Sequence, residues 1–379
     1  MRRDTALLGV VMTCSVLLAG SAPGYAAIQD KTATYALNMF SDVDGVSVYT
    51  QYIDYSMKTT NQVTTSFQWV HDKVVIPAID AAPGTPEAID GITSASRPII
   101  DNQDAFEDFV KIRNSLQGGV NYRGASASYY ISSENDYLAQ MLSGGYSRAF
   151  LNENFNLSGG ASYSWDNITP IQADGSTVSA FRNTMHWNLV ATQIMTPTSV
   201  LRVGLEYNQV NGQQHDPYRS VYVDGGIEPE LHPDRRSRRD VFLKVSKYLG
   251  NESSLKADFR YYEDDWDISS QTFGIKLNQR ISRAVTFRYR YRYYTQIPAW
   301  FYRDDYQNTT NVDGYQTGDY RLGGYGAHLF GGHLTWHPES LFGGIDWVKH
   351  TELNFTLERY FNSNNFTANI IETSLSVSF

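Results

Sequence analysis

The sequence is short of cysteine and of charge. Its 379 residues include one cysteine, Cys14, which lies in an N-terminal apolar run that we expect to be removed. The mature chain then has no cysteine, which excludes disulfides, thiol catalysis and covalent haem attachment through C-x-x-C-H. A charged fraction of 19% beside a hydrophobic fraction of 41% excludes disorder, and a net charge of −9 disfavours nucleic acid as a partner.

Long apolar runs are also missing after the first residues. The chain opens with Arg2 and Arg3, continues with an apolar run over 6–19 and reaches a small-x-small site at 24–26. This order is typical of a secretory signal peptide, with cleavage after Ala26. No later run approaches the 18 residues of a spanning helix. The sequence predicts a signal peptide at 1–26 and a single domain at 27–379.

Alternation of apolar and polar residues dominates that domain. In the segment 284–294, the odd positions carry Val285, Phe287 and three tyrosines, while the even positions carry Thr286 and three arginines. A period of two is the side-chain period of a strand. A soluble β-sandwich would show the same period, so the connections must decide between the two folds.

Sixteen strands are predicted, with connections that alternate in length. The strands lie at 32–40, 46–57, 62–70, 111–121, 124–132, 137–150, 154–165, 183–195, 199–209, 239–248, 253–263, 271–280, 284–296, 326–336, 347–361 and 368–379. Tight turns such as 123–124 and 250–252 alternate with long segments such as 71–110 and 297–325. Only Trp187 among seven tryptophans falls inside a strand, as expected when aromatic girdles mark two membrane interfaces. These features predict an all-β, transmembrane antiparallel β-barrel of the outer-membrane type.

The C-terminus carries a further signal. The chain ends Leu375-Ser-Val377-Ser-Phe379, with apolar residues at alternate positions and a terminal aromatic ring. This ending resembles the recognition signal by which Gram-negative outer-membrane proteins reach their barrel-assembly machinery. The resemblance implies that Phe379 is part of an assembly signal and that the machinery is a partner.

Four internal motifs resemble a family of exported Gram-negative outer-membrane proteins known only as a domain of unknown function. They are Asp90-Gly-Ile-Thr-Ser-Ala-Ser96, Ser132-Ser-Glu134-Asn-Asp136-Tyr137, Arg260-Tyr-Tyr-Glu-Asp-Asp-Trp266 and Tyr293-Tyr-Thr-Gln-Ile-Pro-Ala-Trp-Phe-Tyr302. The resemblance spans most of the mature chain. It implies a porin-like barrel in the outer membrane of a Gram-negative bacterium, and it implies no activity.

Function is then expected in the lumen, because sixteen strands enclose an aqueous channel. If the aromatic stripes face lipid, seven basic side chains on four neighbouring strands face inward: Lys244, Lys256, Arg260, Lys276, Arg288, Arg290 and Arg292. Four acids are expected to oppose them across the barrel closure: Glu352, Glu358, Glu372 and Asp54. Charged walls set the selectivity of pores. These residues are therefore predicted to line a channel for passive diffusion of small polar or anionic solutes. The alternative is that they pair with Asp258 and nearby carboxylates to satisfy a polar interior.

The segment 71–110 has eight acids against two bases, and four prolines. Loops of this length are usually functional or disordered. Folded inward, it would lay its acids against the basic side chains and act as a constriction or plug. Left outside, it would be a solvated surface loop. The motif residues Gly91 to Ser96 favour insertion.

Two other functions stay open. The barrel could be a sheath for an electron-transfer partner, or an outer-membrane enzyme. No G-x-S-x-G motif is present, and no catalytic, metal or cofactor residue is predicted. His350 and Glu352 share a strand face, which suggests at most a weak metal site. The run 235–239 holds four arginines that could bind lipopolysaccharide phosphates, so membrane lipid and lipopolysaccharide are expected partners. The oligomeric state is left open.

Overall fold

The computed structural model describes residues 28–43, 45–59, 62–76, 109–171, 176–223, 226–304, 306, 313–339, 348 and 350–378. The predicted signal peptide, the segment 77–108 and Phe379 lie outside the described residues. The expectations for cleavage, for an inserted acidic loop and for the terminal assembly signal therefore stay predictions.

Strands make up most of the described chain. Those of the barrel are β1 (Ile28–Asp42), β2 (Ser47–Thr59), β3 (Val63–Ile76), β4 (Phe109–Tyr122), β5 (Ala125–Ser133), β6 (Tyr137–Phe150), β7 (Phe155–Ile168), β8 (Ala180–Thr196), β9 (Ser199–Gly212), β12 (Arg235–Tyr248), β13 (Ser253–Asp264), β14 (Ser269–Arg280), β15 (Val285–Gln296), β16 (Tyr325–Trp336), β17 (Thr351–Asn362) and β18 (Thr367–Ser378). A two-stranded sheet, β10 (Ser220–Val223) with β11 (Gly226–Pro229), and a 3-10 turn, η2 (Tyr320–Leu322), lie in the connections.

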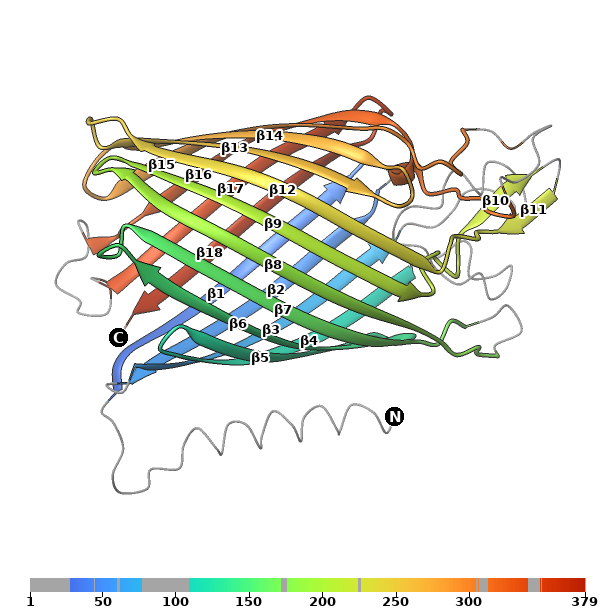
Figure 1. Cartoon of the computed structure of the whole chain (residues 1–379), viewed down its shortest axis with the longest axis horizontal. Helices are drawn as coiled ribbons and strands as arrows, with labels where there is room; N and C mark the ends of the chain where they lie inside the picture. Colours follow the sequence, from blue (N-terminus) through green and yellow to red (C-terminus); the bar gives the residue numbers. More distant parts are fainter. Residues whose placement is uncertain are drawn as a thin grey trace, which may run out of the picture.

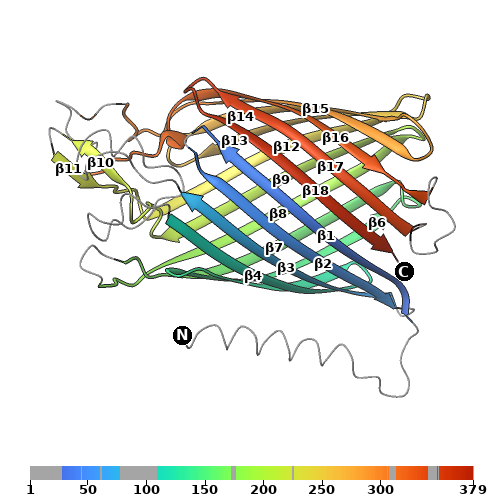
Figure 2. The same cartoon turned by 180° about the vertical axis from the view of Figure 1, so that it is seen from behind.

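Sixteen of these strands close into one antiparallel barrel (Figures 1 and 2). Each strand pairs with its neighbours along the chain, with β12 beside β9, and the first and last strands close the ring. The closing register runs from Thr32 opposite Ser378 to Asp42 opposite Ala368. Closure leaves no free sheet edge, which a membrane requires. The predicted fold class and strand number are confirmed.

The outer face of the barrel is apolar. Alternate side chains such as Trp187, Leu243 and Tyr289 are 52%, 42% and 52% exposed, while their neighbours on each strand face the interior. Exposed apolar side chains in unbroken rows are stable against lipid and not against water. The barrel is therefore a transmembrane barrel of the outer-membrane type. Among the described residues, no helix is long and apolar enough to cross a bilayer.

The two ends of the barrel differ. One end carries tight turns, in which Arg123 and Gly124 adopt left-handed conformations with φ of 50° and 87°. The first barrel strand begins and the last one ends at this same end (Figure 1). The long connections β9–β12 and β15–β16 emerge at the other end. The predicted alternation of short and long connections thus follows from the antiparallel order of the strands.

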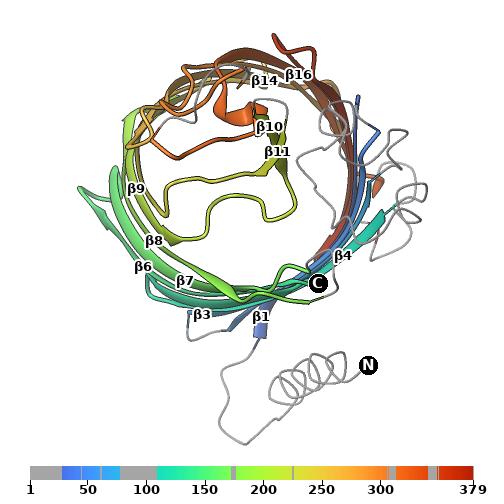
Figure 3. The ribbon, with the colours of Figure 1, turned by 90° about the vertical axis from the view of Figure 1, so that its right-hand side faces the viewer.

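The long connections fold back over the mouth of the barrel. Figure 3 shows β10, β11 and the η2 turn within the barrel outline when the molecule is viewed from the long-loop end. A buried apolar cluster lies at this end and comprises Trp266, Ile268, Ala299, Phe301 and Leu322. Because a barrel lumen is polar, the apolar core of this chain is built from connections and strand ends. This core holds the in-folded connections against the barrel wall.

Candidate functional site

The seven basic side chains predicted for the lumen all lie on the face opposite the exposed apolar stripe. Lys244 is on β12, Lys256 and Arg260 on β13, Lys276 on β14, and Arg288, Arg290 and Arg292 on β15. These four strands are consecutive in the sheet. We call this set the basic wall.

Strand register brings three members of the basic wall side by side. Lys256 is directly opposite Lys276, and Lys276 is directly opposite Arg290. Like charges in directly opposite positions destabilise a sheet. The row ends at Gly331 and then Glu358, which are the next register partners of Arg290. A single carboxylate thus terminates a row of three cations.

A glycine makes the contact between Arg290 and Glu358 possible. The guanidinium Nη1 of Arg290 lies 2.7 and 3.0 Å from the two carboxylate oxygens of Glu358, across the full width of β16. A Cβ atom added at Gly331 would lie 2.8 Å from Cγ of Glu358. The pair therefore depends on a position without a side chain.

The acids do not all oppose the basic wall. Arg288, Arg290, Glu358 and Glu372 line one cavity of about 190 Å³, because β15 to β18 are consecutive strands. The expectation that Glu358 and Glu372 face the wall across the barrel is wrong, since both adjoin it. Glu352 lies near the tight-turn end and accepts a hydrogen bond from Asn354 at 2.8 Å. Asp54 is placed on β2, beyond the closing strand pair.

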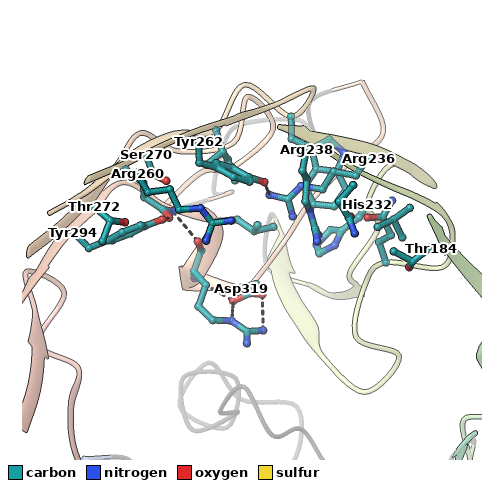
Figure 4. A pocket seen from close by; sticks show the side chains of 18 of the residues that line it. Thr184, His232, Arg236, Arg238, Arg260, Tyr262, Ser270, Thr272, Tyr294 and Asp319 are labelled. Atoms are coloured by element: carbon teal, nitrogen blue, oxygen red, sulfur yellow. Dashed lines mark hydrogen bonds and ion pairs between the residues drawn. The ribbon is translucent and has the colours of Figure 1, made fainter. Parts of the chain in front are cut away.

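A larger cavity of about 620 Å³ lies at the long-loop end, and we call it the chamber (Figure 4). Strands β8, β9 and β12 to β15 form its outer wall, and the in-folded connections form its inner wall. Six arginines line it: Arg182, Arg236, Arg238, Arg260, Arg292 and Arg321. Asp319 is the one carboxylate among the described lining residues. The chamber is therefore strongly cationic at its surface.

Asp264 organises the outer wall of the chamber. Its carboxylate accepts hydrogen bonds from Arg236 at 2.5 and 2.9 Å, and from the hydroxyl of Tyr262 at 2.6 Å. It also accepts from the backbone N–H groups of Trp266 and Ile268 at 2.9 and 3.1 Å. One buried carboxylate thus fixes both the β13–β14 turn and the guanidinium of Arg236. That guanidinium lies 4.1 Å from the ring centre of Trp266, in a cation–π contact.

The inner wall contains a second ionic cluster. Asp319 binds Arg321 through two bonds of 2.8 Å and lies 3.3 Å from Arg219. Although burial opposes the charge, the Arg321 hydrogen bond and both guanidiniums hold the pKa of Asp319 below its usual range. Glu230 is fully buried and accepts from Thr317 at 2.9 Å, and its burial raises its pKa.

His232 sits between this ionic cluster and the apolar core. Its ring lies 5.5 Å from the rings of both Trp266 and Phe301, and 3.9 Å separates its Nε2 from Glu230. Burial, with a smaller contribution from the neighbouring His215, lowers the pKa of His232 to about 4. The imidazole is therefore neutral at neutral pH.

Tyr218 fastens the inner wall to the far side of the barrel. Its hydroxyl donates to the carboxylate of Asp136, which lies in the β5–β6 connection. The same hydroxyl accepts from the N–H of Ile171 at 3.2 Å, in the β7–β8 connection. The segment 213–234 thus leaves β9, contacts the opposite rim and returns to β12. The mouth of the barrel is crossed by described residues, not only by the segment 71–110 considered from the sequence.

The arginine run at 235–239 is divided between two faces. Arg236 and Arg238 face the chamber, whereas Arg239 is on the outer face and pairs with Glu263 at 2.8 Å. The hypothesis of one arginine clamp for lipopolysaccharide is therefore wrong for Arg236 and Arg238. Sequence reasoning missed these two as site residues, although their spacing of two already placed them on one strand face.

Three of the motifs quoted from the sequence meet around the chamber. Residues 132–137 supply the Asp136 contact and Tyr137, residues 260–266 supply Arg260, Asp264 and Trp266, and residues 293–302 supply Tyr294 and the core ring of Phe301. The remaining motif lies outside the described residues. Proximity in space, which spacing along the chain cannot give, unites these segments.

The histidines near β16 and β17 do not form a metal site. His333 contacts Thr356 at 2.8 Å, and His337 lies 4.0 Å from Glu352. Within the part of the chain that the structure describes, no three His, Cys, Asp or Glu side chains are grouped to hold a metal ion.

Comparison with known families identifies the sequence. Residues 6–370 match the family described as "Protein of unknown function (DUF3570)". The chain belongs to this family. No curated protein matches the chain. The resemblance inferred from the four motifs is therefore confirmed, and it leaves the activity of this family member to be argued from its site.

Solved outer-membrane barrels resemble the structure at low sequence identity. The outer membrane protein opdK of Pseudomonas aeruginosa is 9% identical with a TM-score of 0.43, covering 92% of this chain and 99% of that one. A loop-deletion mutant of OmpT of Vibrio cholerae is 9% identical with a TM-score of 0.45, covering 93% and 99%. The siderophore receptor PirA of Pseudomonas aeruginosa is 9% identical with a TM-score of 0.44, and this chain covers 57% of it.

Proposed function

We propose that this family member is a porin-like channel of the Gram-negative outer membrane for passive diffusion of small polar and anionic solutes, without enzymatic activity. The observation that carries the proposal is the basic wall, which lies on the inner face of a closed sixteen-stranded barrel. A barrel of this size leaves an aqueous lumen, whereas eight strands would be filled by side chains.

The charge balance of the wall favours anions. Seven bases lie on four neighbouring strands, and the carboxylates that adjoin them are fewer. Consecutive inward residues on a strand are about 6.6 Å apart, and the Debye length in 0.1 M salt is about 10 Å, so their potentials overlap. A passing anion would meet a continuous positive strip.

The in-folded connections bear on the alternative in which the barrel is a sheath. The segment 213–234 crosses the long-loop mouth through the Tyr218 contact with Asp136. A folded partner entering from this end would meet that crossing, while a small solute would pass beside it. The described contacts therefore favour solutes over a partner protein.

Planar-bilayer recording tests the channel. We expect the purified protein to conduct, and to show a reversal potential on the anion-selective side in a tenfold KCl gradient. Replacement of Lys256 and Lys276 by Glu should shift the reversal potential toward cations, most strongly at low salt. These two lysines suit the test because the described residues give neither an ion pair. The matched control is Lys247→Glu, which changes the same charge near a tight turn, where Lys247 contacts Thr198.

Two results would contradict the proposal. A folded wild-type protein that does not conduct would reject the channel. A conducting protein whose reversal potential is unchanged in the double variant, and equal to that of Lys247→Glu, would reject the basic wall as the selectivity element.

A further inference from the structure

Two of the six chamber arginines differ from the other four. Four arginines have a carboxylate partner, in the pairs Arg182–Asp166, Arg236–Asp264, Arg260–Asp240 and Arg321–Asp319. Within the described residues, Arg238 and Arg292 have no hydrogen bond and no ion pair. The Nε atom of Arg238 is buried without any hydrogen-bond partner. Two guanidiniums in this cavity therefore lack an anion.

This arrangement is unfavourable for an empty chamber. A guanidinium withdrawn from water without a counter-charge destabilises the folded state. Arg238 is in addition repelled by its neighbours Arg236 and Arg182, which carry the same charge. Sites of this kind, where stability is lost locally, often serve binding. An anionic solute would supply the missing partner.

We propose that the chamber is a saturable binding site for small multivalent oxyanions, whose carboxylate or phosphate groups bind Arg238 and Arg292. The inference rests on the proposed channel, because it names the class of solute that the lumen would pass. The planar fork of arginine binds carboxylate and phosphate oxygens through two parallel hydrogen bonds.

The rest of the chamber fits such a solute. Its volume of about 620 Å³ admits a small molecule and excludes a macromolecule. The hydroxyls of Thr184, Ser270 and Thr272 line the same space and can bond the polar body of a solute (Figure 4). Its one lining carboxylate, Asp319, already binds Arg321. A cationic solute would find no free counter-charge among these residues.

Arg292 connects the chamber with the lumen. It lines the chamber and also an adjoining cavity of about 200 Å³, together with Tyr294, Tyr325 and Tyr360. The next inward residue on β15 is Arg290 of the basic wall, about 6.6 Å along the strand. A bound anion could therefore move from the chamber to the wall without leaving a positive environment.

Equilibrium binding to the purified full-length barrel in detergent tests the site. Citrate and inorganic phosphate are the probes, followed by calorimetry and by tryptophan fluorescence, since Trp266 lines the chamber. We expect saturable binding of at least one probe, and acetate should bind at least tenfold more weakly than citrate. Whichever of citrate and phosphate binds more tightly identifies the anionic group. Choline should not bind.

Charge-neutral variants locate the site. Arg238→Gln and Arg292→Gln should each weaken binding by roughly 10- to 100-fold, as expected when a charged hydrogen-bond partner is lost. Arg238→Lys should recover only part of the affinity, because it keeps the charge and lacks the fork. The control Lys247→Gln removes a positive charge at the opposite end of β12 and should bind as the wild type does. Trp266→Phe should abolish the fluorescence change and leave a calorimetric signal.

The outcomes separate this inference from the channel. Binding needs no conduction, so a protein that saturates with citrate but does not conduct supports the chamber and rejects the channel. A protein that conducts but shows no saturable binding of either probe overturns the chamber alone. Folded Arg238→Gln and Arg292→Gln variants with wild-type affinity would also overturn it. If one variant does not fold, the other still decides the test.

Discussion

The basic wall and the chamber use the same residue types in different settings. In the wall, strand register alone lines up Lys256, Lys276 and Arg290, and their surroundings are the open lumen. In the chamber, connections cover the arginines, and buried carboxylates such as Asp264 hold them in place. The comparison shows that register suffices to place charges in a barrel, while a defined binding cavity requires the loops.

Replacing Asp264 by Ala should break the chamber and spare the wall, with the largest effect considered. The change leaves Arg236 without its partner and removes the acceptor for two backbone N–H groups. Loss of one partner of a buried ion pair costs about 3–5 kcal/mol. Urea unfolding in lipid vesicles should show the loss. The exposed neighbour Asp267, changed to Asn, is the control, and an equal effect of both variants would contradict the role of Asp264.

Gly331→Ala should have the reverse selectivity and damage the wall. The new Cβ atom would lie 2.8 Å from Cγ of Glu358 and would displace the carboxylate from Arg290. Overpacking of this kind costs about 1–3 kcal/mol. Unfolding midpoints measure the loss, and citrate binding in the chamber should be retained. At Gly118 a Cβ meets nothing within 4 Å, so Gly118→Ala should be neutral.

The chamber should be acid-sensitive where the wall is not. Burial lowers the pKa of His232 to about 4 from its usual 6.5, so the folded loops favour neutral imidazole. Their stability is fully present above about pH 6.5 and is lost as the pH falls toward 4, by about 1–2 kcal/mol at pH 5. The raised pKa of Glu230 acts in the opposite direction, which reduces the net effect. His215, Arg219 and Asp319 also face this histidine.

Proteolysis of the long-loop end measures this acid effect. Cleavage within 213–234 should be faster at pH 5 than at pH 7 in the wild type. His232→Phe keeps an aromatic ring against Trp266 and removes the titration, so its cleavage should depend less on pH. An equal pH dependence in both proteins would reject His232 as the sensitive group.

Tyr218→Phe should have the smallest effect of the four changes. It removes the hydrogen bonds to Asp136 and to the Ile171 N–H while keeping the ring. A single hydrogen bond contributes about 1 kcal/mol. We expect faster proteolysis of 213–234 at neutral pH and unchanged global unfolding. Unchanged cleavage would show that the apolar core alone holds the inner wall.

Much of the barrel could be predicted from residues alone. Alternation in segments such as 284–294 specified strands, and the side-chain period of two assigned Arg288, Arg290 and Arg292 to one face. The even strand number and the tight turns specified the order of neighbours. These features are local, so one segment at a time contains the necessary information.

The chamber could not be predicted in this way. Arg321 and Asp319 lie in a connection with no period, and their place beside Arg236 depends on how that connection folds back. The small sheet of β10 and β11 is too short to stand out by alternation. Pairings such as Arg290 with Glu358 span two strands and depend on Gly331, which carries no charge to attract notice.

The sequence by itself determined a closed transmembrane barrel and the inward face of each strand, because the side-chain period and the membrane leave no other stable arrangement. Only the tertiary structure decided which charges meet. Ionic contacts between β12 and β13, and across β16, depend on strand register and on groups far apart in the chain. The two arginines without a counter-charge are likewise visible only in three dimensions, because the lack of a partner is a property of the whole neighbourhood.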